Sequence, residues 1–252
     1  MQLVETGPAV TVHGLTKRFG TAPNVLEEVS LEVAEGEFLC ILGASGCGKS
    51  TLLSLVADLD QPTTGTVEVR NGKPALMFQE PALFPWLTAR ENVELALRLK
   101  KVGKKERAER AGDLLELVRL RDAGDKRVHE LSGGMRQRVA MARALAQDSS
   151  VLLMDEPFAA LDAITRDVLH EELVRIRESQ SLTVLFVTHN VREAVRLGDR
   201  VVLLSSRPGR VAKTYDVDIA QPRRIESPEV AGLSVRITDD LRNEIRRHGG
   251  QS

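Results

Sequence analysis

One short segment, "GASGCGKST" at residues 43–51, constrains the fold of this chain more than any other. It matches the pattern G-x-x-x-x-G-K-[ST], follows the apolar run "EFLCIL" and precedes "KSTLLSLVADL", which has helical spacing. Glycines at Gly43, Gly46 and Gly48 let backbone N–H groups turn inward around phosphate oxygens at a helix N-terminus. In such a loop Lys49 neutralises phosphate charge and Ser50 offers a hydroxyl to Mg²⁺. The segment predicts a strand–loop–helix unit that binds a nucleotide; the alternative is a glycine-rich turn that matches by chance.

A second segment, "VLLMDEP" at residues 151–157, supplies carboxylates of the kind a nucleotide site needs. The apolar run predicts a strand that ends in Asp155 and Glu156, at the edge of the sheet where ligands bind in open α/β folds. Asp155 suits coordination of Mg²⁺ through water, and Glu156 suits a carboxylate that orients or deprotonates an attacking water. Taken alone, the segment also fits two solvated acids at a strand end.

Two more segments place anion-binding or hydrogen-bonding groups at the ends of elements. "LSGGMRQR" at residues 131–138 puts Ser132 and two glycines at the start of a predicted helix, a second N-terminus suited to an anion but without its own lysine. "TVLFVTH" ends in His189, which could contact a γ-phosphate or the attacking water, although a histidine at a strand end is more often structural. Cys47 is interpreted as a small residue that fills the glycine-rich loop rather than as a nucleophile.

The order of strand and helix patterns predicts a single α/β domain over residues 1–252, with a parallel sheet covered by helices on both faces. An inserted helical subdomain is expected at about 86–134, and Thr88 with Glu91 has the pattern of a capping box at its first helix. Asn71-Gly72 predicts a hairpin at residues 70–74. Residues 220–252 are expected to form a surface helix or a partly ordered tail. Further strands are predicted at "AVTVHGLT", "VSLEV", "ALMFQ" and "RVVLLSS", and further helices near 104–120, 132–146 and 162–179.

The composition indicates which partners and which compartment suit this chain. The formal net charge is −1, from 35 basic and 36 acidic residues, so nothing in the charge balance favours nucleic acid. The basic stretch "LKKVGKKERAER" at residues 99–110 contains Glu106 and Glu109 and is interpreted as a solvated helix face. Two cysteines are too few for a disulfide framework and favour a reducing, cytosolic setting. Neither a secretory signal nor an apolar run of roughly 20 residues is present, so work at a membrane would require a partner.

The segment "FQEPALFPWLT" at residues 78–88 concentrates aromatic side chains in a chain that has few. Phe78, Phe84 and Trp86 are three of only eight aromatic residues, counted as six Phe, one Trp and one Tyr. Pro81 and Pro85 prevent a regular helix or central strand here. An irregular connector between the sheet and the helical insertion is therefore expected.

Six motifs taken together resemble the ABC transporter ATPase family, in the family's order and from Phe19 to about Gly209. They are "GASGCGKST", Gln79, "LSGGM", "VLLMDEP", "ALD" at 160–162 and "THN" at 188–190. The resemblance implies a P-loop NTPase ABC ATPase fold with a RecA-like core, an N-terminal antiparallel β subdomain and an inserted α-helical subdomain. It also implies ATP and Mg²⁺ as cofactors and a head-to-tail homodimer, or a pair with a close relative. Each ATP would lie between the phosphate loop of one subunit and Ser132 and Gly134 of the other.

The resemblance also assigns roles residue by residue. The implied catalytic residues are Glu156, His189 and Gln79, and the implied metal-binding residues are Ser50, Gln79 and Asp155. The implied nucleotide-binding residues are Phe19, Val25, Gly43, Ser45, Gly46, Cys47, Gly48, Lys49, Ser50, Thr51, Ser132, Gly133, Gly134 and Asp162. Phe19 stands where the family more often has Tyr, and its ring should still stack on adenine. Asp58 stands where many relatives have Gly; it ends the loop helix and tolerates a left-handed cap.

Within the family, "FQEPALFPWLTARENV" and "FAALDAITR" resemble the subgroup that serves importers of nitrate, sulfonate or taurine. This implies an ATP-hydrolysing subunit, peripheral on the cytoplasmic face of the cell membrane, that drives a partner permease and, through it, serves an external solute-binding protein. Because the sequence stops at residue 252, the extra C-terminal regulatory domain seen in the sugar-importer branch is not expected here. Phe84, Trp86 and Leu87 are expected to form part of the permease-docking cleft, with Glu80 and Glu91 near its rim. The alternative is that these side chains pack the subdomain boundary.

Two other functions remain as alternatives. A soluble ABC-type ATPase of DNA or ribosome processes usually carries two cassettes in one chain, a long coiled coil or zinc cysteines, and the sequence has none of these. A nucleotide-binding regulator without turnover is disfavoured because the water-polarising Glu156 is in place.

Overall fold

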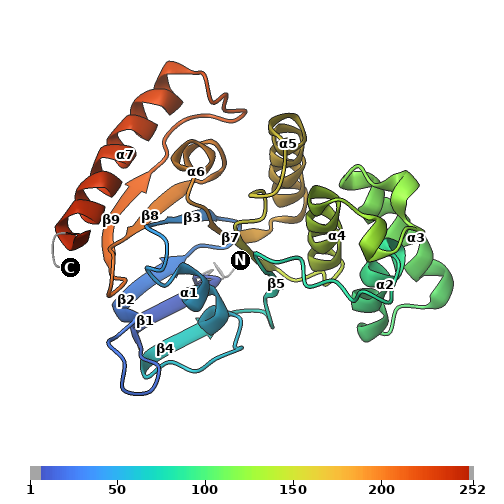
Figure 1. Ribbon diagram of the computed structural model, residues 1–252, viewed down its shortest axis with the longest axis horizontal. Helices are drawn as coiled ribbons and strands as arrows, with labels where there is room; N and C mark the ends of the chain where they lie inside the picture. Colours follow the sequence, from blue (N-terminus) through green and yellow to red (C-terminus); the bar gives the residue numbers. More distant parts are fainter. Residues whose placement is uncertain (1–6, 250–252) are drawn as a thin grey trace, which may run out of the picture.

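Two β-sheets of different character organise residues 7–249, the part of the chain that the computed structural model describes (Figure 1). The smaller sheet is antiparallel, with strand order β2-β1-β4. Its strands are β1 (Val10–Lys17), β2 (Leu26–Val33) and β4 (Thr64–Val69). Buried residues recur at about every second position of β1 and β2, as expected of a sheet with one face on the core. This sheet confirms the predicted N-terminal antiparallel subdomain.

The larger sheet has strand order β5-β6-β7-β3-β8-β9. Its strands are β3 (Phe38–Leu42), β5 (Ala75–Met77), β6 (Val151–Asp155), β7 (Thr183–Val187), β8 (Arg200–Leu204) and β9 (Val211–Asp216). All neighbours are parallel except β9, which runs antiparallel to β8 and which the sequence patterns did not predict. Every residue of β3, β6 and β7 is buried, which explains why these strands read as unbroken apolar runs. The sheet confirms the predicted RecA-like α/β core.

The two faces of the larger sheet are covered by different elements, and the alternation along each strand decides which side chain meets which cover. Leu39 and Ile41 of β3 belong to the core shared with α1 (Lys49–Val56) and the antiparallel sheet. Phe38 and Cys40 belong to the core shared with the helices of the other face. Those helices are α5 (Ala163–Gln180), α6 (Val191–Leu197) and α7 (Pro228–Gly249), together with α4 (Gly133–Leu145).

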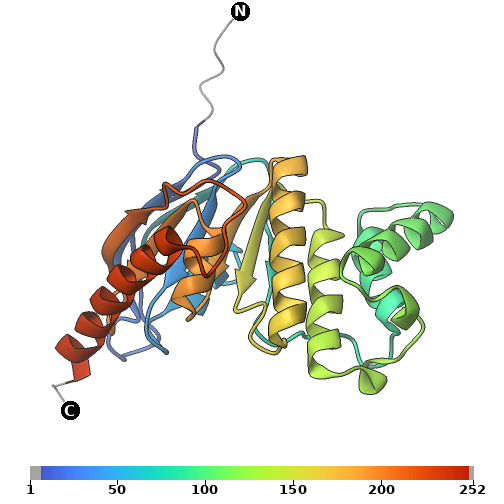
Figure 2. The same cartoon turned by 90° about the horizontal axis from the view of Figure 1, so that it is seen from above.

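Helices α2 (Ala89–Leu99), α3 (Lys104–Leu117) and α4 form the inserted helical part, joined by the short helices η1 (Arg121–Ala123) and η2 (Val128–Glu130). The predicted capping box is present: Thr88 Oγ1 accepts from Glu91 N at 3.2 Å, and Glu91 Oε2 accepts from Thr88 N at 2.8 Å. Figure 2 shows α2 and α3 at one end of the molecule and α7 at the other, with the larger sheet between them.

The predicted hairpin at residues 70–74 is wrong. Asn71 and Gly72 do have the positive φ angles, 62° and 107°, that make this dipeptide a turn signal. However, β4 before the turn pairs with β1, and β5 after it pairs with β6, in a different sheet. The turn specifies only a change of direction; burial of β5 beside the apolar strand β6 decides the pairing.

The C-terminal region is a docked surface helix. Val230 and Ile237 of α7 are fully buried against the core of the larger sheet. Lys213 Nζ and Tyr215 Oη of β9 donate to Asp240 Oδ2 of α7 at 2.7 and 2.6 Å, and these bonds lower the pKa of Asp240. No helix within residues 7–249 is long and apolar enough to cross a membrane.

Candidate functional site

The phosphate loop lies between β3 and α1, as predicted. Gly46 and Gly48 have φ angles of 75° and 102°, which L-residues with a side chain rarely adopt. A Cβ on Gly48 would also lie only 2.6 Å from Leu26 Cδ2, so a larger residue does not fit. Lys49, only 7% exposed, directs its Nζ to the carbonyl oxygens of Gly43 and Ala44 at 2.9 Å each. The ammonium group is therefore held inside the turn of the loop.

Cys47 fills this loop from within. Its side chain is buried, and burial raises the pKa of its thiol, with Lys49 acting in the opposite direction. A buried thiol with a raised pKa is a poor nucleophile. The structure agrees with its interpretation as a small residue that packs the loop.

Ser50 and Asp155 bring oxygen ligands together beside this loop. Ser50, in the first turn of α1, lies beside Asp155 at the end of β6, and its hydroxyl lowers the pKa of the Asp155 carboxyl group. Asp155 is only 8% exposed, and burial raises the pKa of its carboxyl group against the lowering effects of Ser50 and Lys49. A hydroxyl and a carboxylate are ligands that Mg²⁺ prefers, so this pair fits the predicted metal site. Gln79, the third predicted metal ligand, directs its Nε2 to Glu156 Oε2 at 3.4 Å.

Glu156 is the point where three predicted catalytic side chains meet. Gln79 Nε2 lies 3.4 Å and His189 Nδ1 lies 3.1 Å from the same atom, Glu156 Oε2. The backbone of Glu156 has a left-handed φ of 45°, and its N–H donates to Val187 O at 3.0 Å. This bond ties the turn after β6 to the end of β7. The side-chain amide of Gln79 and the imidazole of His189, which come from two other segments, thus orient the carboxylate.

The predicted adenine contacts lie in the connection between β1 and β2. Phe19 is 50% exposed, and Lys17 Nζ lies 4.8 Å from the centre of its ring. Val25 is half-buried, and its N–H donates to Lys17 O at 2.8 Å. The exposed ring face of Phe19 can accept a stacked base.

Ser132 and Asp162 both cap helices. Ser132 Oγ accepts from Met135 N at 3.2 Å at the start of α4, and Asp162 Oδ1 accepts from Thr165 N at 2.9 Å at the start of α5. The bond from Thr165 lowers the pKa of Asp162. Between described residues, no hydrogen bond or ion pair joins Ser132, Gly133, Gly134 or Asp162 to the phosphate loop of the same chain. Helix α4 packs against α2 and α3 and lies apart from α1 (Figure 1).

The aromatic connector, residues 78–88, is held by its backbone. Gln137 and Arg143 of α4 donate to carbonyl oxygens of Gln79, Pro81 and Ala82, and Arg127 donates to that of Trp86. The buried Asn92 bonds Phe84 through both N–H and carbonyl. The aromatic rings remain outside: Trp86 is 65% and Phe84 37% exposed, with ring centres 5.5 Å apart.

Two residues that hold the site together, Gln137 and Glu193, were not predicted from the sequence. Gln137 links α4 to the carbonyl of Gln79 at 3.3 Å, so the helix that begins at Ser132 touches the residue that contacts Glu156. Glu193 is buried and bonds both Thr188 Oγ1, beside His189, and His170 Nε2. The only signal for Glu193 was its place three residues after the Asn190 cap of α6.

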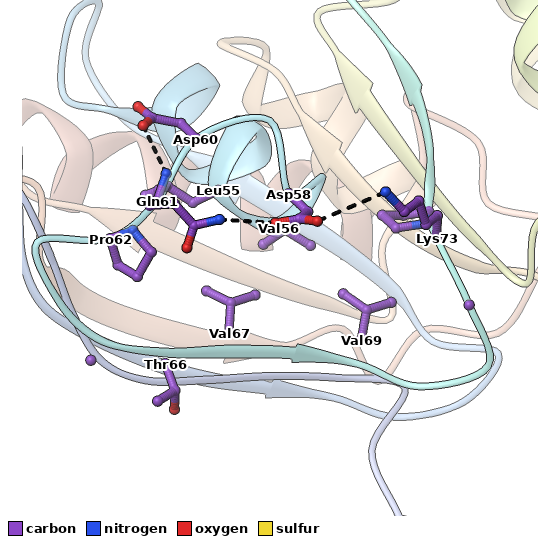
Figure 3. A pocket seen from close by; sticks show the side chains of 13 residues that line it. Leu55, Val56, Asp58, Asp60, Gln61, Pro62, Thr66, Val67, Val69 and Lys73 are labelled. Atoms are coloured by element: carbon purple, nitrogen blue, oxygen red, sulfur yellow. Dashed lines mark hydrogen bonds and ion pairs between the residues drawn. The ribbon is translucent and has the colours of Figure 1, made fainter.

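A hollow at the other end of α1 contains none of the predicted site residues. It lies between the C-terminal end of α1 and β4, where Asp58 accepts from Gln61 Nε2 at 3.0 Å and faces Lys73 (Figure 3). Asp58 has a φ of 56°, which confirms the left-handed cap predicted there. Leu59 N donates to Ser54 O and Asp58 N to Leu55 O, which closes the helix end.

A glycine-rich loop between a buried parallel strand and a helix, facing carboxylates at the end of another parallel strand, defines a P-loop nucleotide-binding protein. A model of the ABC transporter family matches residues 26–159. The chain belongs to this family, and it is an ATP-binding subunit with ATPase activity.

Similar proteins extend the match over most of the chain. The taurine import ATP-binding protein of Mesorhizobium japonicum is 49% identical over 205 residues, covering 78% of this chain and 79% of that protein. An aliphatic sulfonates import ATP-binding protein of the same organism is 44% identical over 251 residues, covering 94% and 93%. A solved dimeric ATP-binding cassette bound to ADP and Pi superposes with a TM-score of 0.78 at 35% identity, covering 84% of this chain and all of that one. The soluble DNA or ribosome alternative is not favoured.

Proposed function

We propose that this chain is the ATP-hydrolysing subunit of an importer for a small anion such as nitrate, sulfonate or taurine. The names of the similar proteins support taurine and aliphatic sulfonates, which share a sulfonate group. The observation that carries the proposal is the convergence of Gln79 and His189 on Glu156 Oε2, at the end of the strand next to β7.

In this proposal the phosphate loop binds ATP through its backbone N–H groups and Lys49. Ser50 and Asp155, with Gln79, would hold Mg²⁺, which supplies positive charge to the transferring phosphoryl group. Glu156 would orient a water and take its proton as the water attacks the γ-phosphate, releasing ADP and phosphate. His189 and Gln79 would keep the Glu156 carboxylate aimed at that water.

The proposed assembly is a head-to-tail homodimer, and the dimeric state of the similar cassette supports it. Ser132, Gly133 and Gly134 of one subunit would complete the ATP site of the other, with Asp162 nearby. Phe19 and Val25 would contact adenine. The dimer would act peripherally on the cytoplasmic face of the cell membrane, coupled to a permease and, through it, to a solute-binding protein.

We further propose that Phe84, Trp86 and Leu87 dock a cytoplasmic helix of the permease. The connector backbone is fixed by α2 and α4, whereas its aromatic rings stay exposed, which is unusual for residues that only pack a boundary. Aromatic side chains on a rigid backbone bury a large area on binding with little loss of conformational entropy. Glu80 and Glu91, both exposed, would meet basic residues at the rim.

Phosphate release by the purified full-length chain tests the ATPase proposal. Lys49→Ala should lose nucleotide binding, turnover or both. Glu156→Gln should keep ATP binding and lose hydrolysis by about 100-fold or more, because the proton acceptor is gone. Hydrolysis at the parental rate in Glu156→Gln would contradict the assignment of the base. In the assembled complex, stimulation of turnover by taurine but not by nitrate would identify the sulfonate group as the recognised feature.

A further inference from the structure

The turn between β8 and β9, residues 205–210 ("SSRPGR"), is hydrogen-bonded to the start of β2 and packs against the phosphate loop. Gly209 N donates to Val25 O at 2.8 Å, and Glu27 N donates to Gly209 O at 3.0 Å. A Cβ on Gly209 would lie 2.1 Å from Cys47 O, so the turn rests directly on the backbone of the phosphate loop. This contact requires glycine at 209.

The turn is also rigid within itself. Ser205 N donates to Arg210 O at 2.9 Å, and Arg210 N donates to Ser205 Oγ at 3.0 Å. Ser205 Oγ donates in turn to Pro208 O at 2.8 Å. These hydrogen bonds fix the backbone on both sides of Arg207, which is the charged residue between Ser205 and Pro208.

Arg207 directs its guanidinium group at the phosphate loop. Its Nη2 lies 3.0 Å, and its Cζ and Nε lie 3.8 Å, from the point where a Cβ on Gly46 would be. Within residues 7–249, Arg207 makes no ion pair or hydrogen bond with a protein side chain, and it is exposed. By contrast Arg210, in the same turn, pairs with Glu27 Oε2 at 2.8 Å. An unpaired guanidinium thus stands against a loop whose backbone is built to surround an anion.

We propose that Arg207 is a further nucleotide-binding residue, which binds the phosphate groups of ATP and ADP together with Lys49. Guanidinium groups bind phosphate oxygens with two parallel N–H donors, and they keep their charge at all physiological pH values. The inference rests on the proposed nucleotide site, because the phosphate groups are placed by the phosphate loop. No sequence pattern indicated this role, since the turn lies far from that loop along the chain.

The test compares Arg207→Ala, Arg207→Lys and the matched control Arg210→Ala in the full-length chain, by calorimetric titration with MgADP and MgATP. Arg207→Ala should weaken both affinities about fivefold, and Arg207→Lys less, because an exposed charge contact is of modest strength. Arg207→Ala should also reduce the dependence of affinity on salt concentration, since one phosphate contact is lost. Arg210→Ala should match the parental chain. Thermal unfolding of each variant checks that the turn remains folded.

Three results separate this inference from the proposed function. No binding of nucleotide by the parental chain would overturn the proposed function itself. Parental binding that is lost in Lys49→Ala but equal in Arg207→Ala and Arg210→Ala would overturn only the role of Arg207. Unchanged affinity for MgADP with weaker ATP-dependent dimerisation in Arg207→Ala would also overturn it, and would assign Arg207 to the subunit contact.

Discussion

At the scale of single residues, Asp155 and Glu156 occupy environments that are unfavourable for the folding free energy. Asp155 is buried beside Ser50, and its carboxyl group has a raised pKa because burial disfavours the charged form. Glu156 adopts a left-handed backbone that few residues other than glycine, Asn and Asp accept. Strain and buried charge of this kind gather at functional sites, and both residues lie where β6 ends.

Asp155→Asn should raise the thermal stability of the chain and lower its ATPase activity. Because the folded-state pKa of Asp155 is raised, its ionisation destabilises the fold as pH rises from the unfolded value, about 4, through the folded value. The variant lacks this penalty, so its melting temperature should exceed that of the parental chain by a few degrees at neutral pH and match it more closely at lower pH. Mg²⁺-dependent hydrolysis should fall by about 100-fold or more.

Melting curves of the ligand-free chain between pH 4 and pH 8 measure the effect, with the exposed Asp122→Asn as the control that should change neither quantity. A variant less stable than the parental chain at neutral pH would contradict the role of burial in the raised pKa.

At the scale of elements, the connector 78–88 is the segment that joins the nucleotide site to the helical insertion. Its first part contacts Glu156 through Gln79, and its last part runs into the capping box of α2. Donors from α4 hold its carbonyl groups along the way. A displacement of the helical insertion would therefore be transmitted to Gln79 through backbone contacts.

Trp86→Ala should leave the fold and the basal ATPase activity of the full-length chain nearly intact. Its ring is exposed, so little buried area is lost. Affinity for the permease should fall tenfold or more if the ring is an anchor of the interface. Leu99→Ala, which removes another exposed apolar side chain at the end of α2, is the matched control and should bind normally. Loss of folding, or unchanged binding in pull-down with the permease, would favour the boundary-packing alternative.

At the scale of the whole molecule, the chain carries two anion-binding helix starts that do not meet within one subunit. The start of α1 bears Lys49, whereas the start of α4 bears Ser132 and no bond from it reaches the phosphate loop within the described part of the chain. The proposed head-to-tail pair would resolve this separation, because each helix start would then face the partner's loop.

Two inactive variants should restore activity when mixed. Lys49→Ala disables the phosphate loop, and Ser132→Arg disables the helix start that completes the partner's ATP site. Both ATP sites are therefore defective in a homodimer of either variant. In the mixed dimer both defects fall in one site, and the other is intact. Random pairing should return about a quarter of parental ATPase activity. Phosphate release by the mixture, against each variant alone, measures this; no recovery would contradict the head-to-tail arrangement.

The amino-acid sequence by itself determined the features that depend on local chemistry. The spacing of glycines, Lys49 and Ser50 predicted the phosphate loop, Thr88 and Glu91 predicted a helix start, and unbroken apolar runs predicted β3, β6 and β7. These elements are specified by backbone sterics, capping and burial within a few residues, and the structure confirmed them.

The tertiary structure alone decided which distant segments meet. Pairing of β5 with β6 overrode the hairpin expected at Asn71-Gly72, and β9 joined the sheet edge without a clear pattern of its own. Gln79 and His189 reach Glu156 across 77 and 33 residues, and Arg207 reaches Gly46 only because Gly209 rests on the loop. Such contacts depend on how buried surfaces fit together in three dimensions, and no short stretch of sequence encodes that fit.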